Sequence, residues 1–228
     1  MQQIKKTIEN RKVILYQSEG KDAPVVYSPM YEESGEMLIA ECEKLKCRPF
    51  QLVTISELQW NDDLSPWKSE PVFKNGEGFG GNAADFTSLL TEQIIPFAEN
   101  LTGISSRRII AGYSMAGLYA LYAPYVTDAF SDVVCASGSV WYPNFVSYIE
   151  TNKYIRQPDS VYLSLGDKES RTKNPYLSQT ESCMEKLYRN FRQMNIQSVF
   201  EMNQGNHYKD AVLRLAKGIA WTLNNTNL

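Results

Sequence analysis

Short apolar runs alternate along the chain with longer segments in which apolar residues recur every three or four positions. The short runs have the length and composition of buried strands. They span Arg11–Tyr16, Pro24–Ser28, Phe50–Ile55, Arg108–Ala111, Ser131–Ala136, Val161–Leu165 and Gln197–Met202. The longer segments have the spacing of amphipathic or buried helices. They span Glu36–Leu45, Asp85–Phe97, Met115–Ala123, Thr180–Met194 and Ala211–Leu223.

This alternation predicts an α/β fold with a mainly parallel central sheet that carries helices on both faces. The run Pro24–Ser28 supports a covered sheet, because it is too apolar to have one face in water. In such sheets, binding sites form beyond the carboxyl ends of the strands. The polar and aromatic groups that follow the expected strands should therefore gather at one edge. They are the loop Ser28–Tyr31, Ser114, Trp141, Glu169 and His207.

The longest irregular stretch spans residues 56–82 and contains Trp60, Trp67 and four glycines between Gly76 and Gly81. Loops of this length inside a domain usually line a site or are disordered, and the two tryptophans favour an ordered loop near the site. The alternative is that at least one of these tryptophans only anchors the long connection to the core.

Length and charge limit the classes of function. The 228 residues are expected to form a single domain, 1–228, with a three-layer core, and a hydrophobic fraction of 43% excludes a disordered chain. The net charge is −3 with both signs scattered, so neither nucleic acid nor a membrane surface is an expected partner. The first residues lead into no apolar signal core and no apolar run reaches membrane-spanning length, so we expect a cytoplasmic protein.

Cysteine and histidine usage predicts no metal and no organic cofactor. The four cysteines form no Cys-x-x-Cys pair and are expected to be free thiols. With a single histidine in the chain, a zinc site is not expected. No glycine-rich loop precedes a Lys-Ser or Lys-Thr pair, so nucleotide-dependent chemistry is disfavoured.

The turn Gly112–Gly117, with the sequence GYSMAG, lies between the apolar strand Arg108–Ala111 and the apolar helix Met115–Ala123. A serine at the apex of a strand–turn–helix has the geometry of a nucleophile elbow. The sharp turn raises the hydroxyl above the sheet, and the N-terminus of the helix points at it. Ala116 stands where the pattern usually has a second glycine. The alternative is a tight turn in which Ser114 is incidental.

A serine hydroxyl is a weak nucleophile at neutral pH and needs a base, which is usually an imidazole. The single histidine, His207, follows the last expected strand, where on its own it would be interpreted as a surface residue. With Ser114 upstream, the chain order serine, acid, histidine favours a role as general base. The imidazole also needs an acceptor on its other nitrogen. The candidates are Asp167 and Glu169, which both follow the strand Val161–Leu165.

Four segments in this order resemble the α/β-hydrolase superfamily, and within it the esterases related to esterase D, feruloyl esterases and enterochelin (siderophore) esterases. They are GYSMAG at 112–117, SGSVWY at 137–142, LGDKE at 165–169 and GNHYKD at 205–210. The resemblance extends from Arg11 to Trp221 and implies the α/β-hydrolase fold. In that superfamily the acid commonly stands three residues after a glycine that ends its strand. Counting from Gly166 selects Glu169 and leaves Asp167 as the alternative.

Backbone N–H donors for an oxyanion are expected from Met115, which follows the serine, and from Tyr31, in the loop after the second expected strand. Members of the superfamily often carry His-Gly in this loop, whereas this chain has Pro-Met-Tyr at 29–31. A backbone donor does not depend on its side chain, so Tyr31 remains a candidate. Trp141 and the stretch 56–82 are candidate walls of a substrate pocket.

These features predict a serine hydrolase that cleaves a small-molecule carboxylic ester through a Ser114–His207–Glu169 triad and an acyl-enzyme intermediate. The nearest alternative is an acyltransferase, thioesterase or peptidase that uses the same three residues, because a fold does not determine the reaction. The alternative from another class is a catalytically silent binding module that keeps the turn as architecture. Ala116 and the absent His-Gly pair give that alternative some weight.

Overall fold

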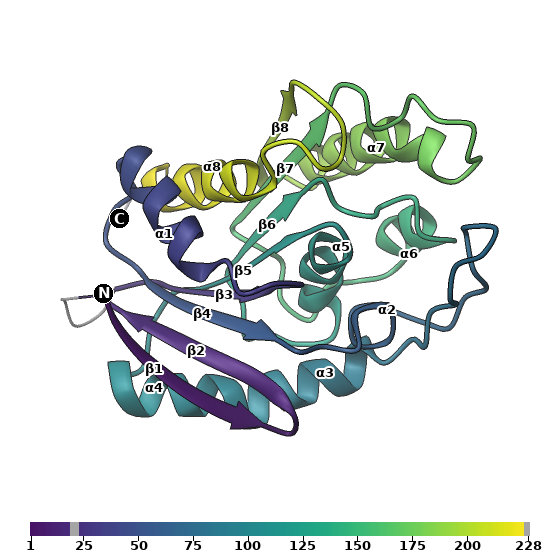
Figure 1. The fold of residues 1–228 in the computed structure, drawn as a ribbon. Coiled ribbons are helices and arrows are strands. Elements are labelled where there is room, and N and C mark those ends of the chain that lie inside the picture. The colour runs from purple at the N-terminus through teal and green to yellow at the C-terminus, as the bar shows by residue number, and fades with distance from the viewer. Residues whose placement is uncertain (19–22, 226–228) are drawn as a thin grey trace.

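The computed structural model describes residues 1–18 and 23–225, and one eight-stranded sheet runs through them (Figure 1). The strands are β1 (Gln2–Ile8), β2 (Arg11–Gln17), β3 (Val25–Pro29), β4 (Gln51–Ser56), β5 (Arg108–Tyr113), β6 (Asp132–Ala136), β7 (Ser160–Gly166) and β8 (Gln197–Asn203). Their order across the sheet is β1-β2-β4-β3-β5-β6-β7-β8. Strands β3 to β8 run parallel, while β1 and β2 are antiparallel additions at one edge. The expected mainly parallel sheet is confirmed.

Strand β1 is not among the elements expected from the apolar pattern. Its sequence, QQIKKTI, is polar, and most of its side chains are exposed because it forms the edge of the sheet. It joins β2 through Glu9 and Asn10, whose φ angles of 44° and 62° are both positive, as the favoured two-residue hairpins require. Lys5 and Lys6 place charge on this edge, which discourages pairing with another chain.

Helices cover both faces of the sheet, as expected. One face packs against α1 (Gly35–Lys44) and α8 (Ala211–Asn224). The helices on the other face are α3 (Ala83–Leu89), α4 (Ile95–Thr102), α5 (Met115–Tyr122), α6 (Phe145–Thr151) and α7 (Thr180–Gln193). The short 3₁₀ turns are η2 (Ala123–Tyr125) and η3 (Leu177–Gln179). Each face of the sheet has its own cluster of buried apolar side chains.

The helix expected over Asp85–Phe97 is longer in the structure and is interrupted by a wider turn. Between α3 and α4 lies the π-helical turn η1 (Leu90–Ile94). Pro96, in the first turn of α4, has no amide N–H to donate to the preceding turn. The irregular turn therefore lies where the proline cannot continue the ordinary α-helical hydrogen bonding.

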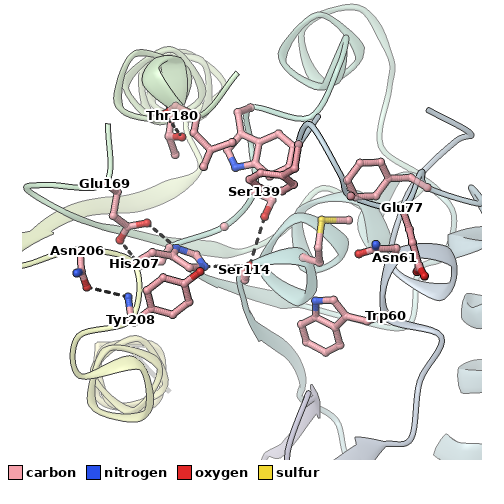
Figure 2. Close-up of a pocket in the computed structure, with 18 of the residues that line it drawn as sticks. Trp60, Asn61, Glu77, Ser114, Ser139, Glu169, Thr180, Asn206, His207 and Tyr208 are labelled. Atoms are coloured by element: carbon pink, nitrogen blue, oxygen red, sulfur yellow. Dashed lines mark hydrogen bonds and ion pairs between the residues drawn. The ribbon is translucent and has the colours of Figure 1, made fainter. Parts of the chain in front are cut away.

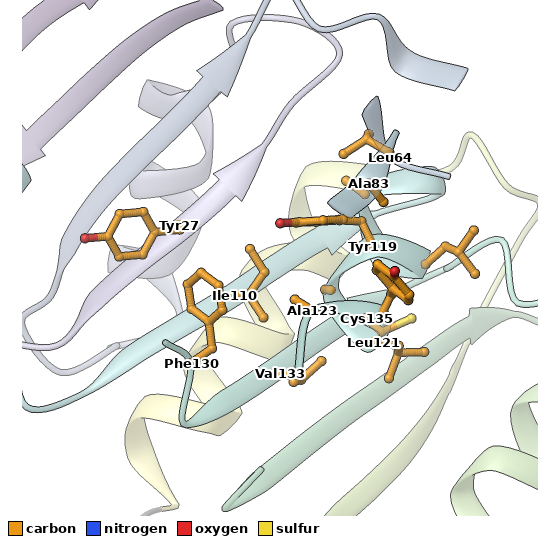
Figure 3. Close-up of a cluster of buried hydrophobic side chains, with 14 of the residues drawn as sticks. Tyr27, Leu64, Ala83, Ile110, Tyr119, Leu121, Ala123, Phe130, Val133 and Cys135 are labelled. Atoms are coloured by element: carbon orange, nitrogen blue, oxygen red, sulfur yellow. The ribbon is translucent and has the colours of Figure 1, made fainter. Parts of the chain in front are cut away.

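Helix α5, which follows the serine turn, is buried along its whole length. Figure 3 shows Tyr119 of α5 in one cluster with Ile110 of β5 and Val133 of β6. The Tyr119 hydroxyl lies 2.8 Å from Thr87 Oγ1 of α3, so its polar atom has a partner inside the core. This packing fixes the N-terminus of α5 behind Ser114.

The stretch 56–82 contains the short helix α2 (Trp60–Asp63) and an isolated bridge between Ser69 and Phe79. Trp67 anchors the stretch: its Nε1 donates to the Pro143 carbonyl at 3.1 Å. The Trp67 ring also packs 5.1 Å from that of Tyr148. Trp67 therefore has the anchoring role that the sequence left open for one of the two tryptophans.

Candidate active site

Ser114 lies between β5 and α5 in a backbone conformation that side chains rarely adopt, with φ 59° and ψ −122°. Gly112 is required for this turn, because a Cβ at that position would come within 2.1 Å of the Ala116 carbonyl oxygen. A methyl group is tolerated at position 116 itself, where Ala116 is fully buried. The local strain holds the serine at the end of β5, the arrangement of a nucleophile elbow.

Three side chains from separate loops form one hydrogen-bonded series beyond the carboxyl ends of the strands (Figure 2). Ser114 Oγ lies 3.1 Å from His207 Nε2. His207 Nδ1 lies 2.8 Å from Glu169 Oε2. The imidazole is about one-third exposed, whereas the Glu169 side chain is 5% exposed. The structure thus brings together the three residues that the sequence predicts as nucleophile, base and acid.

The carboxylate of Glu169 uses its two oxygens differently. While Oε2 faces His207, Oε1 accepts from the Gly166 N–H at 2.7 Å, from Ser137 Oγ at 2.8 Å and from Arg214 Nη1 at 2.8 Å. Burial raises the pKa of Glu169, but the hydrogen bond and charge of His207, with the bonds from Ser137 and Gly166, outweigh burial and hold that pKa below its ordinary value. Glu169 is therefore a carboxylate at neutral pH.

Asp167, the alternative acid, faces another way. Its Oδ1 accepts from the Gly205 N–H at 2.6 Å, and Gly205 has a φ of 112°. Asp167 thus holds the turn that carries His207 without facing the imidazole, which is the turn-stabilising role of an aspartate in a loop.

The predicted oxyanion donors belong to residues that line cavities containing Ser114. Met115 is the first residue of α5, and Tyr31 follows β3. Within residues 1–18 and 23–225 no protein acceptor takes the N–H of Met115 or Tyr31, whereas the Met30 N–H donates to the Ile55 carbonyl at 2.8 Å. The Met30 N–H is therefore already bonded, whereas the N–H groups of Met115 and Tyr31 remain available to a ligand.

Two cavities meet at Ser114 and His207. The first has a volume of about 460 Å³ and is lined by Met115, Ser139 and Trp141, among others. Ser139 is buried and its hydroxyl lies 3.5 Å from that of Ser114. Aromatic side chains from the stretch 56–82, namely Trp60, Phe73 and Phe79, complete this wall, so Trp141 and this stretch line one cavity at Ser114.

The second cavity has a volume of about 390 Å³ and lies between the loop after β3 and helix α8. Its lining is mainly apolar and includes Met30, Tyr31, Val212 and Leu215. The ring of Tyr31 packs edge-on against Trp60 at 5.4 Å between centroids. Both cavities also share Trp60, Ser114, His207 and Tyr208, so they adjoin at the serine.

The family model described as "Putative esterase" matches residues 33–212, from just before α1 into the first turn of α8. The chain belongs to this family. The prediction of a carboxylic ester hydrolase of the esterase group is therefore confirmed at the level of the family.

Individual relatives of this chain are distant. The uncharacterized protein YbbA of Bacillus subtilis (strain 168) is 26% identical over 166 residues, which cover 69% of this chain and 66% of that protein, slightly less than two thirds of its length. The siderophore hydrolase EstA from Aspergillus nidulans is 17% identical with a TM-score of 0.73, covering 99% of this chain and 95% of that chain.

Two further solved structures are similar to this chain. An IroE-like serine hydrolase from Shewanella oneidensis is 15% identical with a TM-score of 0.79, over 97% of this chain and 79% of that chain. The enterobactin esterase FES from Shigella flexneri is 17% identical with a TM-score of 0.72, over 97% of this chain and 59% of that chain. These likenesses show the α/β-hydrolase fold, which confirms the predicted fold.

Other sequence expectations concern thiols, metals and membranes. The four cysteines are free, as predicted. Across the part of the chain that the structure describes, no group of three or more His, Cys, Asp or Glu side chains could hold a metal ion. In the same residues, no helix has both the length and the apolar character needed to cross a bilayer.

Sequence reasoning missed two residues that support the series of three side chains. Arg214 is 1% exposed and contacts Glu169, although it lies on a helix whose inward residues were expected to be apolar. Tyr113, which precedes the serine, donates its hydroxyl to the His207 carbonyl at 2.6 Å. One signal for Arg214 was available: a cation in the first turn of a helix is disfavoured by the helix dipole unless an anion lies nearby.

Proposed function

We propose that this protein is a serine esterase that acts through an acyl-enzyme intermediate, with Ser114 as nucleophile, His207 as general base and Glu169 as the acid. The observation that carries this proposal is the continuous contact from Ser114 Oγ through His207 to Glu169, at 3.1 Å and 2.8 Å. These distances are within hydrogen-bond reach, which proton transfer requires.

In the first half-reaction Ser114 Oγ attacks the carbonyl carbon while its proton passes to His207 Nε2. The new C–O bond to the serine forms as the carbonyl electrons move onto oxygen, which becomes an oxyanion. When the tetrahedral intermediate collapses, the bond to the alcohol breaks and the alcohol leaves with the proton from His207. Glu169 keeps the proton-bearing Nδ1 of the imidazole in place and stabilises the imidazolium.

In the second half-reaction water replaces the alcohol. His207 takes a proton from the water as its oxygen attacks the acyl carbon, and the collapse of this intermediate returns the proton to Ser114 Oγ and releases the carboxylic acid. The N–H groups of Met115 and Tyr31 are the proposed donors to the oxyanion in both halves. Their availability within the described residues supports this assignment.

The two cavities support a substrate that carries a sizeable group on each side of the scissile bond. Both cavities include Ser114 and His207 in their lining, so a bound ester can extend from the serine into each of them. Met30, Val212 and Leu215 make the second cavity apolar, which favours an apolar group there. Two structural neighbours are named a siderophore hydrolase and an enterobactin esterase, so large siderophore esters belong in a substrate panel.

The decisive test is labelling with a fluorophosphonate probe, followed by peptide mapping, in the wild type and in Ser114→Ala. We expect one label, on Ser114, and none in the variant. A panel of p-nitrophenyl esters of increasing acyl length, with enterobactin as a large ester, then measures the preference for substrate size. A folded wild-type protein that takes no label and turns over no ester would overturn the proposal in favour of a binding module.

A further inference from the structure

Arg214 is a buried cation for which the proposed chemistry has no direct use. It lies in the first turn of α8, its side chain is 1% exposed, and its Nη1 is 2.8 Å from Glu169 Oε1. The same nitrogen lies 3.1 Å from Ser137 Oγ and 3.3 Å from the Tyr113 hydroxyl. A guanidinium buried to this degree loses most of its hydration, so its contacts must compensate for that loss.

The guanidinium also holds the loop that carries His207. Its Nη2 donates to the carbonyl oxygens of Gln204 and Asn206, at 3.2 Å and 3.0 Å. One planar group therefore contacts the acid, the backbone just before the imidazole, and the hydroxyl of Tyr113 at the end of β5. No other side chain in the described residues bonds both to Glu169 and to the His207 loop backbone in this way.

The absence of a side chain at Gly166 leaves the space that the Arg214 guanidinium occupies. A Cβ at position 166 would come within 2.8 Å of Arg214 Nη1 and 2.9 Å of Nη2, and within 2.4 Å of the Gly205 carbonyl oxygen. The Gly166 N–H meanwhile donates to Glu169 Oε1. The glycine three residues before the acid is thus explained by the lack of room for a Cβ between the Gly205 carbonyl and the guanidinium of Arg214.

We propose that Arg214 is a positioning residue of the esterase site, which fixes the rotamer of Glu169 and compensates the charge of Glu169 so that the Glu169–His207 pair stays unprotonated to lower pH. The proposal rests on the serine esterase mechanism proposed above. It assigns to α8 a role in setting the pH range of activity in addition to its role in covering the sheet.

The sign of the effect follows from the charges. With Arg214 present, adding one proton to the Glu169–His207 pair gives the three groups a net charge of +1, whereas without the cation the same proton gives a neutral set. Uptake of the proton is therefore easier without Arg214. The titratable and charged groups that face this pair or line either cavity with it are Tyr31, Glu32, Glu77, Tyr113, Lys168, Tyr208 and Arg214.

The test uses the fact that His207 is the single histidine of the chain, so that its imidazole resonances can be followed without ambiguity in an NMR titration. In Arg214→Met we expect the midpoint of this titration and the acid limb of kcat/KM to move together to higher pH, by about one unit. In Arg214→Lys, which keeps a charge but loses the planar fork, we expect both midpoints to stay near the wild-type values while kcat falls about tenfold.

A matched control lies one turn further along the same helix. Lys217 also pairs with a glutamate, at 2.6 Å from Glu201 Oε1, and Lys217→Met removes the same charge away from the site. We expect no shift of either midpoint in this variant. If Arg214→Met lowers kcat but leaves both midpoints unchanged, or if Lys217→Met moves them equally, the proposed role of Arg214 is wrong.

Circular dichroism shows whether Arg214→Met folds, and a second variant covers the case in which it does not. If Arg214→Met is unfolded by circular dichroism, Arg214→Lys alone decides: a shift of its midpoint to higher pH, equal to that expected for loss of the cation, would contradict charge compensation. Failure of the esterase mechanism is a separate result, because it appears as absent fluorophosphonate labelling in the wild-type protein. A labelled wild type with unshifted Arg214 variants would overturn this inference alone.

Discussion

The hydroxyl of Tyr113 donates to the backbone carbonyl of His207 at 2.6 Å, so the residue before the candidate nucleophile also holds the candidate base. The two rings lie against each other, with centroids 5.3 Å apart. The turn that presents Ser114 and the turn that presents His207 are thus joined directly, although 94 residues separate Tyr113 from His207. A shift of either turn changes the distance between serine and imidazole.

The first prediction concerns this bond. Tyr113→Phe removes the hydroxyl and leaves the ring, so the His207 carbonyl loses a donor and the imidazole is less well positioned. We expect kcat to fall about 3- to 10-fold with little change in KM, which corresponds to about 1 kcal/mol for one hydrogen bond. Tyr162→Phe is the control, because it removes a comparable bond, to Glu201 at 2.7 Å, elsewhere in the sheet. Equal losses in the two variants would argue against a positioning role for Tyr113.

The second prediction concerns the nucleophile and the base. Ser114→Ala and His207→Ala should each lower kcat/KM by at least about 10⁴-fold, because residues of a triad act as a unit. The double variant should be no less active than either single variant. Steady-state hydrolysis of a p-nitrophenyl ester measures all three, and losses that multiply in the double variant would show that the two residues act independently.

The third prediction separates the two acids. Glu169→Gln should lower kcat about 10³-fold, since the amide cannot stabilise the imidazolium and can select the wrong tautomer of His207. Asp167→Asn should leave kcat within about threefold, because its side chain holds the Gly205 turn and the amide oxygen can still accept that bond. The same ester assay compares the two variants. A reversed ranking would assign the acid to Asp167.

The fourth prediction concerns stability against pH. The pKa of Glu169 in the folded protein lies below its ordinary value of 4.5, so this carboxyl takes up protons more readily in the unfolded chain. Its contribution to the free energy of unfolding is present in full above the ordinary value and is lost as pH falls through the lower folded pKa. Urea unfolding between pH 3 and 6 should therefore show a steeper loss of stability on acidification in the wild type than in Glu169→Gln. Parallel curves for the two proteins would contradict the shift.

The fifth prediction concerns substrate size. Val212→Trp narrows the apolar cavity beside α8, and Leu177→Trp narrows the cavity that contains Trp141. We expect each variant to retain hydrolysis of p-nitrophenyl acetate, while Val212→Trp loses about tenfold or more in kcat/KM on esters with a long apolar chain. Leu177→Trp serves as the matched variant for the opposite side. Unchanged selectivity in both would show that substrates do not use these cavities.

Local sequence patterns were sufficient to predict much of this molecule. The alternation of strands and helices predicted the parallel part of the sheet, and the small residues around Ser114 predicted the sharp turn, because both depend on neighbours in sequence. The place after the strand Val161–Leu165 left two candidates for the acid, and the spacing from Gly166 implied by the family resemblance selected Glu169. Glu169 faces His207 in the structure because the side chain three residues beyond Gly166 turns back toward the strand end, while Asp167 points to Gly205.

The rest depends on contacts between distant segments. Strand β1 is polar because it lies at an edge, so no apolar run marks it. Arg214 lies on the inward side of α8, where it bonds to the carboxylate of Glu169, 45 residues earlier in the chain. The helical periodicity of α8 does not indicate this contact. The roles of Trp60 and Trp67 also differ only through tertiary packing: Trp67 is bonded to Pro143, whereas Trp60 lines both cavities.

The position of α8 in the chain has a consequence for the order in which the site is completed. During synthesis Ser114 emerges long before His207 and Arg214, which belong to the last turn and the last helix that the structure describes. In the proposed mechanism, Ser114 has no base until β8 has joined the sheet and α8 has packed against it. A chain in which these two elements have not yet packed therefore carries a serine that the proposed mechanism leaves inert.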